Sequence, residues 1–308
     1  MIVRNKKHTL KMLFTWRGSV LKKIYPRLII LFAFSLAVYF FHDYYPHVFI
    51  PLNIAAFTLL GISLAIFLGF CNSAAYDRYW EGRKLWGSLM IHSRSLTYQI
   101  LNYIEEKDGF TKEEKKVGVN LIIAFCYALK NQLRKEEDSS VLKRYMSPEV
   151  YNRIKSNRFI PSAILHELTN WINLQHKAGR IDTITQARID QNINELSSIL
   201  AGCERIVHTG IPFAYFVLLD RTVYIYCFIL PFGLIETINW AMPLFVTFVG
   251  YSFIALDAIV AEIAEPFGTE ENDLALTQIC QNIEHSLAEI ADLPLPDISS
   301  PNDKFVIQ

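Results

Sequence analysis

The stretch PLNIAAFTLLGISLAIFLGFCNSAAYDRYWEGRKLWG, residues 51–87, decides the fold of this chain. Its first part, from Pro51 to Tyr76, contains no Asp, Glu, Lys or Arg. A helix needs about 20 apolar residues to cross the hydrocarbon core of a bilayer, and this uncharged run is longer than that. We therefore predict a membrane-spanning helix over this run.

Two stripes of side chains follow the predicted helix at a spacing of four residues, which places successive members on one face. The bulky stripe consists of Thr58, Ile62, Ile66, Phe70 and Ala74. The small stripe, about 100° away on a helix, consists of Phe57, Gly61, Ala65, Gly69 and Ser73. Small residues let helix backbones approach closely, so Gly61, Ala65 and Gly69 are predicted to form a helix-packing groove.

The bulky stripe lies beside this groove, and that arrangement suggests a pore. If several copies of the helix packed around an axis through the small stripe, Ile62, Ile66 and Phe70 could point at the axis as stacked apolar rings. Hydrophobic constrictions of this kind gate channels by dewetting. The alternative is an ordinary surface that faces lipid or a protein core, which is how most apolar stripes are used.

Three motifs identify a family resemblance. Residues 72–87 follow the order N-S-x-A-Y-x-R-Y-W-E-x-R-x-L-W-G, residues 202–215 are GCERIVHTGIPFAY, and residues 262–274 follow E-x-x-x-P-F-G-x-x-x-N-D-L. In this order, and spread over most of the chain, the motifs resemble those of the bestrophin family in its bacterial branch. The resemblance implies a homopentameric ion channel whose second membrane helix lines the pore.

The composition indicates a protein that is partly in a membrane and partly in water. The 308 residues are 52% hydrophobic and 19% charged, and the formal net charge is zero. Eight basic residues and no acidic residue precede Leu28, whereas no Lys or Arg lies between Thr222 and Asp303. The positive-inside rule then predicts a cytoplasmic N-terminus and an external link at residues 42–51, which contain no Lys or Arg.

Further apolar runs complete a predicted topology of four membrane helices with both termini in the cytoplasm. We expect an all-α integral membrane protein of the bacterial inner membrane with a helical cytoplasmic domain, assembled as a bestrophin-like pentamer in the lipid bilayer. The predicted regions are a cytoplasmic N-terminal segment (residues 1–27), membrane helices 1 and 2 (28–83), a cytoplasmic helical domain (84–212), membrane helices 3 and 4 (213–260) and an acidic cytoplasmic C-terminal segment (261–308).

The sequence contains little that suggests catalysis. It has no Gly-rich phosphate loop, no H-E-x-x-H and no G-x-S-x-G motif, and its histidines lack metal-ligand spacing. The five cysteines include no CxxC pair, so neither a disulfide framework nor a zinc site is indicated. Cys203, beside Glu204 and Arg205, has no histidine at the usual partner positions. We predict no enzyme activity, no cofactor and, because basic and acidic residues balance in the middle region, no nucleic-acid partner.

The resemblance implies two further sites. Channels of the family have a second, cytoplasmic constriction made by one apolar residue per subunit, and the matching position here is Ile184, with Ile181 as the alternative. Animal bestrophins also form a calcium clasp after their last membrane helix. The corresponding residues here are 269–273, where Thr269 and Asn272 thin the acidic run. Fewer carboxylates weaken a calcium site, which leaves Glu270 and Asp273 as a weak remnant. We therefore predict no metal site beyond a weak remnant.

The distribution of charged residues predicts whether the channel conducts cations or anions. Acidic residues without basic partners lie between Asp257 and Asp303, and near a cytoplasmic mouth they would raise the local cation concentration. Bacterial relatives are cation channels permeable to sodium, so the resemblance also implies passive conduction of monovalent cations such as Na⁺. The alternatives are a chloride or other anion channel of the same fold, a membrane scaffold that does not conduct, and a secondary transporter.

Overall fold

A computed structural model describes residues 18–45 and 53–295. Every regular element in these ranges is a helix. The chain divides into two compact units. The apolar unit comprises described residues up to Tyr79 together with residues 210–265, and the polar unit comprises residues 80–209 and the described residues from Pro266 onward. Parts of the predicted N-terminal segment, of the external link and of the C-terminal segment (residues 1–17, 46–52 and 296–308) lie outside the described residues.

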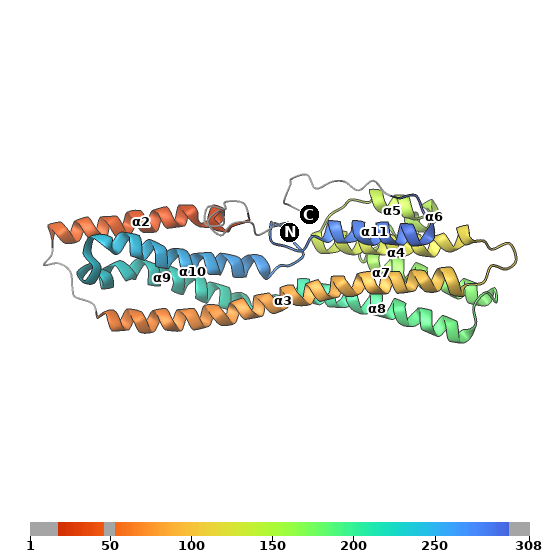
Figure 1. The fold of residues 1–308 in the computed structure, drawn as a ribbon, viewed down its shortest axis with the longest axis horizontal. Helices are drawn as coiled ribbons and strands as arrows, with labels where there is room; N and C mark the ends of the chain where they lie inside the picture. Colours follow the sequence, from red (N-terminus) through yellow and green to blue (C-terminus); the bar gives the residue numbers. More distant parts are fainter. Residues whose placement is uncertain (1–17, 46–52, 296–308) are drawn as a thin grey trace. The chain divides into compact units, whose positions relative to one another are not determined.

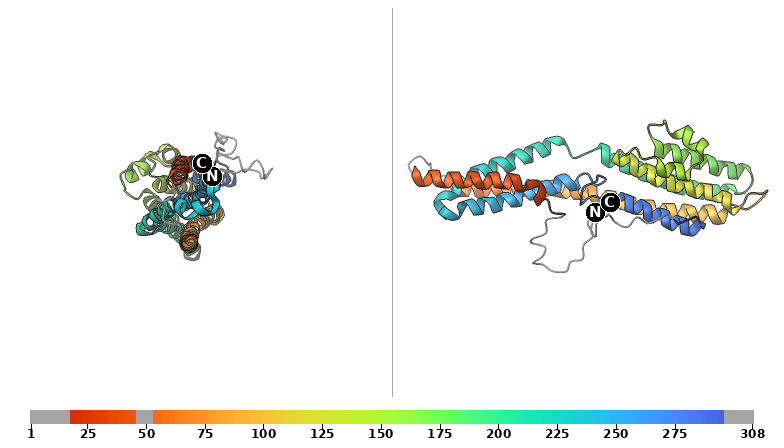
Figure 2. Two further views of the ribbon diagram at one scale, coloured as in Figure 1. Left: turned by 90° about the vertical axis from the view of Figure 1, so that its left-hand side faces the viewer. Right: turned by 90° about the horizontal axis from the view of Figure 1, so that it is seen from above.

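The apolar unit is a bundle of long helices (Figures 1 and 2). Its elements are α2 (Leu21–Tyr44), the first part of α3 (Ile54–Tyr103), α9 (Phe213–Ile238), the short η2 (Asn239–Ala241) and α10 (Met242–Ile263). Helices α2, α9 and α10 pack on one another. The chain reverses at η2, where Asn239 adopts a φ of 45° that ends α9.

Close helix contacts in the apolar unit depend on small residues. Gly233 of α9 lies against the ring of Phe57 of α3, and Gly250 of α10 lies against the side chain of Leu31 of α2. A side chain at either glycine would occupy the space of its partner, so the glycines set how closely these helices approach. The core that results includes Ile24, Leu31, Leu64, Leu68, Val223, Met242 and Val246.

Three stretches of the described chain are long and apolar enough to cross a membrane: α2, α3 and the stretch Phe213–Ile263. The last stretch contains α9, of 26 residues, and α10, of 22 residues. At a rise of about 1.5 Å per residue, each is longer than the roughly 30 Å of a bilayer core. The lengths therefore suit the predicted third and fourth spans, and the number of spans stays a prediction.

Helix α3 is longer than the membrane helix expected from the sequence. It continues for 50 residues from Ile54 to Tyr103, past the predicted domain boundary at residue 83. The sequence changes from apolar to polar near Tyr76 without a helix-breaking Pro or a cap that would end it. As a result, one unbroken helix supplies side chains to both units.

The polar unit is built around α4 (Lys112–Arg134), which is buried along most of its length. The capping box of Thr111 and Glu114 starts this helix. The other helices, besides the second part of α3, are α5 (Ser140–Tyr145), α6 (Pro148–Ile154), α7 (Ile160–Lys177), α8 (Thr183–His208) and α11 (Leu276–Ala291). Helices α5, α7, α8 and α11 all contact α4.

A buried carboxylate joins three helices of the polar unit. The Tyr127 hydroxyl of α4 donates a hydrogen bond to Glu284 of α11 at 2.5 Å, and the Tyr145 hydroxyl of α5 donates to the other carboxylate oxygen. Burial, reinforced by the neighbouring Glu284, raises the pKa of Tyr127. The phenol therefore remains a donor at physiological pH, and Glu284 is held in place by both hydroxyls.

The contact between Gly233 and Phe57 gives a test of the packing. A Cβ at Gly233 would lie 2.5 Å from Cε2 of the Phe57 ring, and overpacking of this kind costs about 1–3 kcal/mol. We expect Gly233→Ala to lower the thermal unfolding temperature in detergent. Gly87→Ala is the matched control, because no atom lies within 4 Å of its added Cβ. Equal unfolding temperatures for the two variants would contradict the packing described.

Candidate pore-lining helix

The bulky stripe of α3 is not part of the core of a single chain. The side chains of Ile62 and Ile66 are each 54% exposed and that of Phe70 is 71% exposed. The face that packs inward carries Leu64 and Leu68, which are 2% and 0% exposed. Since these two leucines already fill the interior, the bulky stripe needs another environment, either lipid or other copies of the chain.

Most of the small stripe is also uncovered. Ala65, Gly69 and Ser73 are exposed, and a Cβ at Gly69 would meet no atom within 4 Å. Two members are covered within the chain. Phe57 belongs to the buried core, and a Cβ at Gly61 would lie 2.7 Å from the hydroxyl oxygen of Tyr226. The groove formed by Ala65 and Gly69 is therefore open to an approaching helix.

An acidic residue continues the face of the bulky stripe. Asp77 lies seven residues after Phe70, which is two helical turns, so the two side chains project from nearly the same face of α3. The Asp77 side chain is exposed, and among the described residues no cation forms an ion pair with it. Asp77 was not among the site residues predicted from the sequence, although its helical spacing from Phe70 indicates the shared face.

The neighbouring Arg78 has a structural role. Its Nε donates a hydrogen bond to the carbonyl oxygen of Ala264 at 3.0 Å. Ala264 is the C-cap residue of α10, where backbone carbonyls lack partners within the helix. Arg78 therefore secures the end of α10 to α3 inside the apolar unit.

Residues of the three motifs meet inside the polar unit. Glu81 of the first motif forms an ion pair with Arg205 of the second. Gly202 of the second motif packs against Leu85 of the first, with an ideal Cβ 2.9 Å from Leu85 Cδ2. Gly82 packs in the same way against Phe267 of the third motif, at 3.0 Å. Residues of all three motifs therefore pack together in one region of the polar unit.

The two candidates for the cytoplasmic constriction differ in environment. Ile181 is 6% exposed and belongs to the core of the polar unit, whereas Ile184 is 72% exposed on the first turn of α8. The Asp182 carboxylate caps this helix by accepting hydrogen bonds from the backbone N–H groups of Ile184 and Thr185, at 2.7 and 2.9 Å. These bonds, with that from Thr185 foremost, lower the pKa of Asp182. A charged cap thus holds Ile184 at a defined position.

The residues predicted to be a weak remnant of a calcium clasp, Glu270 and Asp273, lie in a loop. Asp273 is buried, and its Oδ2 accepts a hydrogen bond from the backbone N–H of Glu270 at 2.8 Å. Within the described ranges, no three His, Cys, Asp or Glu side chains lie close enough to share a metal ion. The carboxylate of Asp273 thus stabilises the turn that precedes α11.

Cys203 is a buried thiol. It is fully enclosed in the polar unit, and burial raises its pKa to about 12. The thiol is therefore protonated near neutral pH, whereas nucleophilic catalysis requires the thiolate. The other four cysteines are likewise buried and free.

Comparison with known proteins places the chain in a family. Residues 1–289 match the family described as "Bacterial/Fungal Bestrophin protein". The chain is 41% identical over 292 residues to the voltage-dependent anion channel-forming protein YneE of Escherichia coli K12, with 95% of this chain and 94% of that protein covered. It is 40% identical over 294 residues to a voltage-dependent anion channel-forming protein of Ralstonia nicotianae, covering 96% and 95%.

The fold agrees with solved structures of the same family. A crystal structure of a bacterial bestrophin homologue from Klebsiella pneumoniae matches with a TM-score of 0.84 and 35% identity, covering 88% of this chain and 99% of that chain. The fold and the sequence together define an all-helical membrane channel and not an enzyme. The chain belongs to the bacterial and fungal bestrophin family. The family prediction made from the three motifs is confirmed.

Proposed function

We propose that five copies of the chain form a channel in the bacterial inner membrane and that α3 of each copy lines a central pore. Ile62, Ile66 and Phe70 form its hydrophobic neck. The observation that carries the proposal is the exposed apolar ridge beside the open groove of Ala65 and Gly69. A ridge that faces lipid would need neither the groove of Ala65 and Gly69 nor the acidic Asp77 further along the same face. A water-filled pore between packed helices is consistent with both features.

The proposed topology has four spans with both termini in the cytoplasm. It rests on the lengths of α2, α9 and α10 and on the apolar first part of α3. It also rests on the excess of Lys and Arg before Leu28. In this arrangement the predicted cytoplasmic domain, residues 84–212, and the segment from residue 261 onward lie on the same side of the membrane.

The proposed permeant ions are monovalent cations such as Na⁺. In a pentamer Asp77 would form an acidic ring two helical turns from Phe70, and rings of Asp or Glu favour cations in channels. The neck itself supplies no charge, so the ring decides the sign. The lack of Lys and Arg between Thr222 and Asp303 also favours cations over anions.

Anion conduction is the second candidate. The relatives from Escherichia coli and Ralstonia nicotianae are named voltage-dependent anion channel-forming proteins, at 41% and 40% identity. Chloride conduction through the same neck would require that basic groups outweigh Asp77 along the path. The two candidates therefore predict opposite shifts in the reversal potential.

We propose Ile184 as the second constriction. Its exposure and its rigid position on the first turn of α8 support this choice, whereas the buried Ile181 would have to leave the core. Glu270 and Asp273 are proposed to stabilise their loop and not to gate the channel by binding calcium.

The mass of the purified protein tests the proposed pentamer. In mild detergent, purified protein should have the mass of a pentamer by native mass spectrometry. Ala65→Leu places a bulky side chain in the open groove, so we expect loss of most of the pentamer while the single chain stays folded. A monomeric wild-type protein would contradict the proposed assembly.

Leu64→Ala is the control for this experiment. Leu64 is 2% exposed in the apolar unit, so its truncation should cost about 2–5 kcal/mol of stability. We expect a lower unfolding temperature and pentamers that still form below it. If Ala65→Leu and Leu64→Ala affected assembly equally, Ala65 would not lie at a subunit contact.

Selectivity is tested by reversal potentials in planar bilayers under asymmetric sodium chloride. We expect a shift toward the sodium equilibrium potential, and we expect Asp77→Asn to reduce that shift because the ring loses its charge. Asp190→Asn, an exposed substitution on α8 of the polar unit, is the charge-matched control. A shift of the wild type toward the chloride equilibrium potential would establish the anion channel instead.

The neck is tested by widening it. An ion in an apolar constriction sheds water without gaining polar partners, which costs many kcal/mol, so a wider neck should conduct better. We expect Ile66→Ala to increase conductance or open probability with pentamers intact. Thr58→Ala, at the outer end of the same stripe, should change the current much less. Unchanged currents in Ile66→Ala pentamers would show that the ridge faces away from the pore.

A further inference from the structure

A short charged segment, residues 77–84, follows the uncharged run of α3. It contains five charged residues: Asp77, Arg78, Glu81, Arg83 and Lys84. Charged side chains close to a membrane are costly unless they are paired or face water, so each of the five needs a partner or an aqueous environment. Their contacts separate the residues that the chain itself uses from those that it leaves open.

Three of the five have a structural role. Arg78 holds the end of α10, and Glu81 pairs with an arginine of α8, as described above. The Arg83 guanidinium lies over the ring of Trp80, with its Cζ atom 5.1 Å from the ring centroid, so a cation–π contact occupies this side chain. These three side chains are therefore committed to contacts within one chain.

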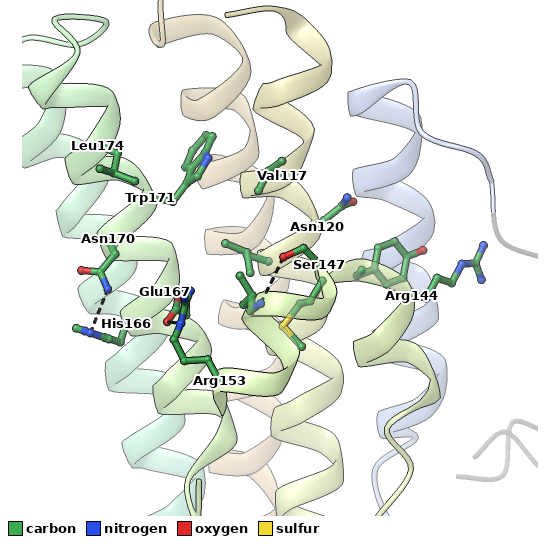
Figure 3. Close-up of a pocket in the computed structure, with 14 residues that line it drawn as sticks. Val117, Asn120, Arg144, Ser147, Arg153, His166, Glu167, Asn170, Trp171 and Leu174 are labelled. Atoms are coloured by element: carbon green, nitrogen blue, oxygen red, sulfur yellow. Dashed lines mark hydrogen bonds and ion pairs between the residues drawn. The ribbon is translucent and has the colours of Figure 1, made fainter. Parts of the chain in front are cut away.

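Asp77 and Lys84, in contrast, are exposed, and neither forms an ion pair or a side-chain hydrogen bond with any described residue. Arg153 shows how a paired charge of the polar unit differs. It donates two parallel hydrogen bonds to Glu167, at 2.9 and 2.6 Å, beside the cavity shown in Figure 3. The charges of Arg153 and Glu167 neutralise each other, whereas those of Asp77 and Lys84 act on whatever lies next to α3.

Asp77 and Lys84 lie on the face of α3 that carries the proposed neck. Residues at intervals of seven along this face all have exposed side chains: Phe70, Asp77, Lys84, Ile91 and Tyr98. Seven residues make two helical turns with a drift of about 20°, so Lys84 is rotated by only about 40° from Phe70. The exposed face of the neck thus continues through the charged segment.

We propose that Lys84 lines the pore as a basic ring that opposes the acidic ring of Asp77, and that it thereby sets how strongly the channel prefers cations. This rests on the pentameric pore proposed above, in which α3 of each copy faces the axis. Rings of Asp or Glu favour cations and rings of Lys or Arg favour anions. The two rings therefore act on permeating ions in opposite directions.

The distance of each ring from the neck decides which one dominates there. At a rise of about 1.5 Å per residue, Asp77 lies about 10 Å from Phe70 along α3, and Lys84 lies about 21 Å from it. Charges are screened over about 8 Å at physiological ionic strength, so the potential of Lys84 in the neck is weaker than that of Asp77. The channel therefore keeps a preference for cations, which Lys84 reduces. A pore in which Lys84 outweighed Asp77 would conduct chloride instead.

Reversal potentials of Lys84→Gln in planar bilayers under asymmetric sodium chloride test the basic ring. Loss of the ammonium groups should increase the ratio of sodium to chloride permeability at least about twofold, because only the acidic ring remains. The shift is toward the sodium equilibrium potential whether the wild type prefers sodium or chloride. An unchanged reversal potential in conducting Lys84→Gln pentamers would overturn the proposed role of Lys84.

Two further variants are the controls. Lys84→Arg keeps the positive charge, so its permeability ratio should equal that of the wild type. Lys155→Gln, at the exposed lysine that follows α6, removes the same charge outside α3 and should also leave the ratio unchanged. Native mass spectrometry confirms that each variant is a pentamer. A change in Lys155→Gln as large as that in Lys84→Gln would show that general surface charge, and not a ring of Lys84, sets the ratio.

The double variant with Asp77→Asn and Lys84→Gln separates the role of Lys84 from the pore itself. With both rings neutral, the permeability ratio should lie between those of the two single variants. Absence of current in wild-type pentamers would overturn the proposed pore, and the ring of Lys84 with it. Conducting pentamers whose ratio falls with Asp77→Asn but does not rise with Lys84→Gln would leave the pore in place and overturn the role of Lys84 alone.

Discussion

The structure depends on how α3 divides its side chains between two faces. Leu64 and Leu68 pack into the apolar unit, and this leaves Ile62 and Ile66 exposed on the opposite side. A helix can pack one stripe of side chains into the core of its own chain and leave a second stripe free to contact another partner. This requires that the first stripe alone is enough to hold the helix in place. The core of a single chain therefore determines which side chains of α3 are left for the proposed pore.

Helix α3 also contacts several parts of the polar unit, and these contacts explain which residues appear in the three motifs. Glu81, Gly82 and Leu85 contact Arg205, Phe267 and Gly202, which come from regions far apart in the sequence. Each contact needs a particular residue type: a charge to pair, or a glycine to admit a neighbouring side chain. This explains why short motifs were sufficient to predict the family and the all-helical fold, even though none of them forms a catalytic site.

Other features could not be predicted from the sequence because they depend on tertiary packing. The periodicity of α3 indicated the bulky stripe of Ile62 and Ile66 but not whether this stripe faces inward, and it did not identify Leu64 and Leu68 as the inward face. The sequence does not decide between Ile181 and Ile184, because Ile181 lies just before α8 and Ile184 lies in its first turn. Only the burial of the two side chains distinguishes them. Trp171 of α7 packs on Gly118 of α4, a contact that no local sequence pattern indicates.

The central claim is that the exposed ridge of α3 faces water in an assembled pore, and cysteine accessibility tests it most directly. The native cysteines are buried, so Ile66→Cys introduces an accessible thiol, and Leu60→Cys introduces one on another exposed face of α3. With a water-soluble cationic methanethiosulfonate reagent applied to open channels, the account predicts rapid loss of current in Ile66→Cys and none in Leu60→Cys. Unchanged current in Ile66→Cys, or equal loss in both variants, would contradict it.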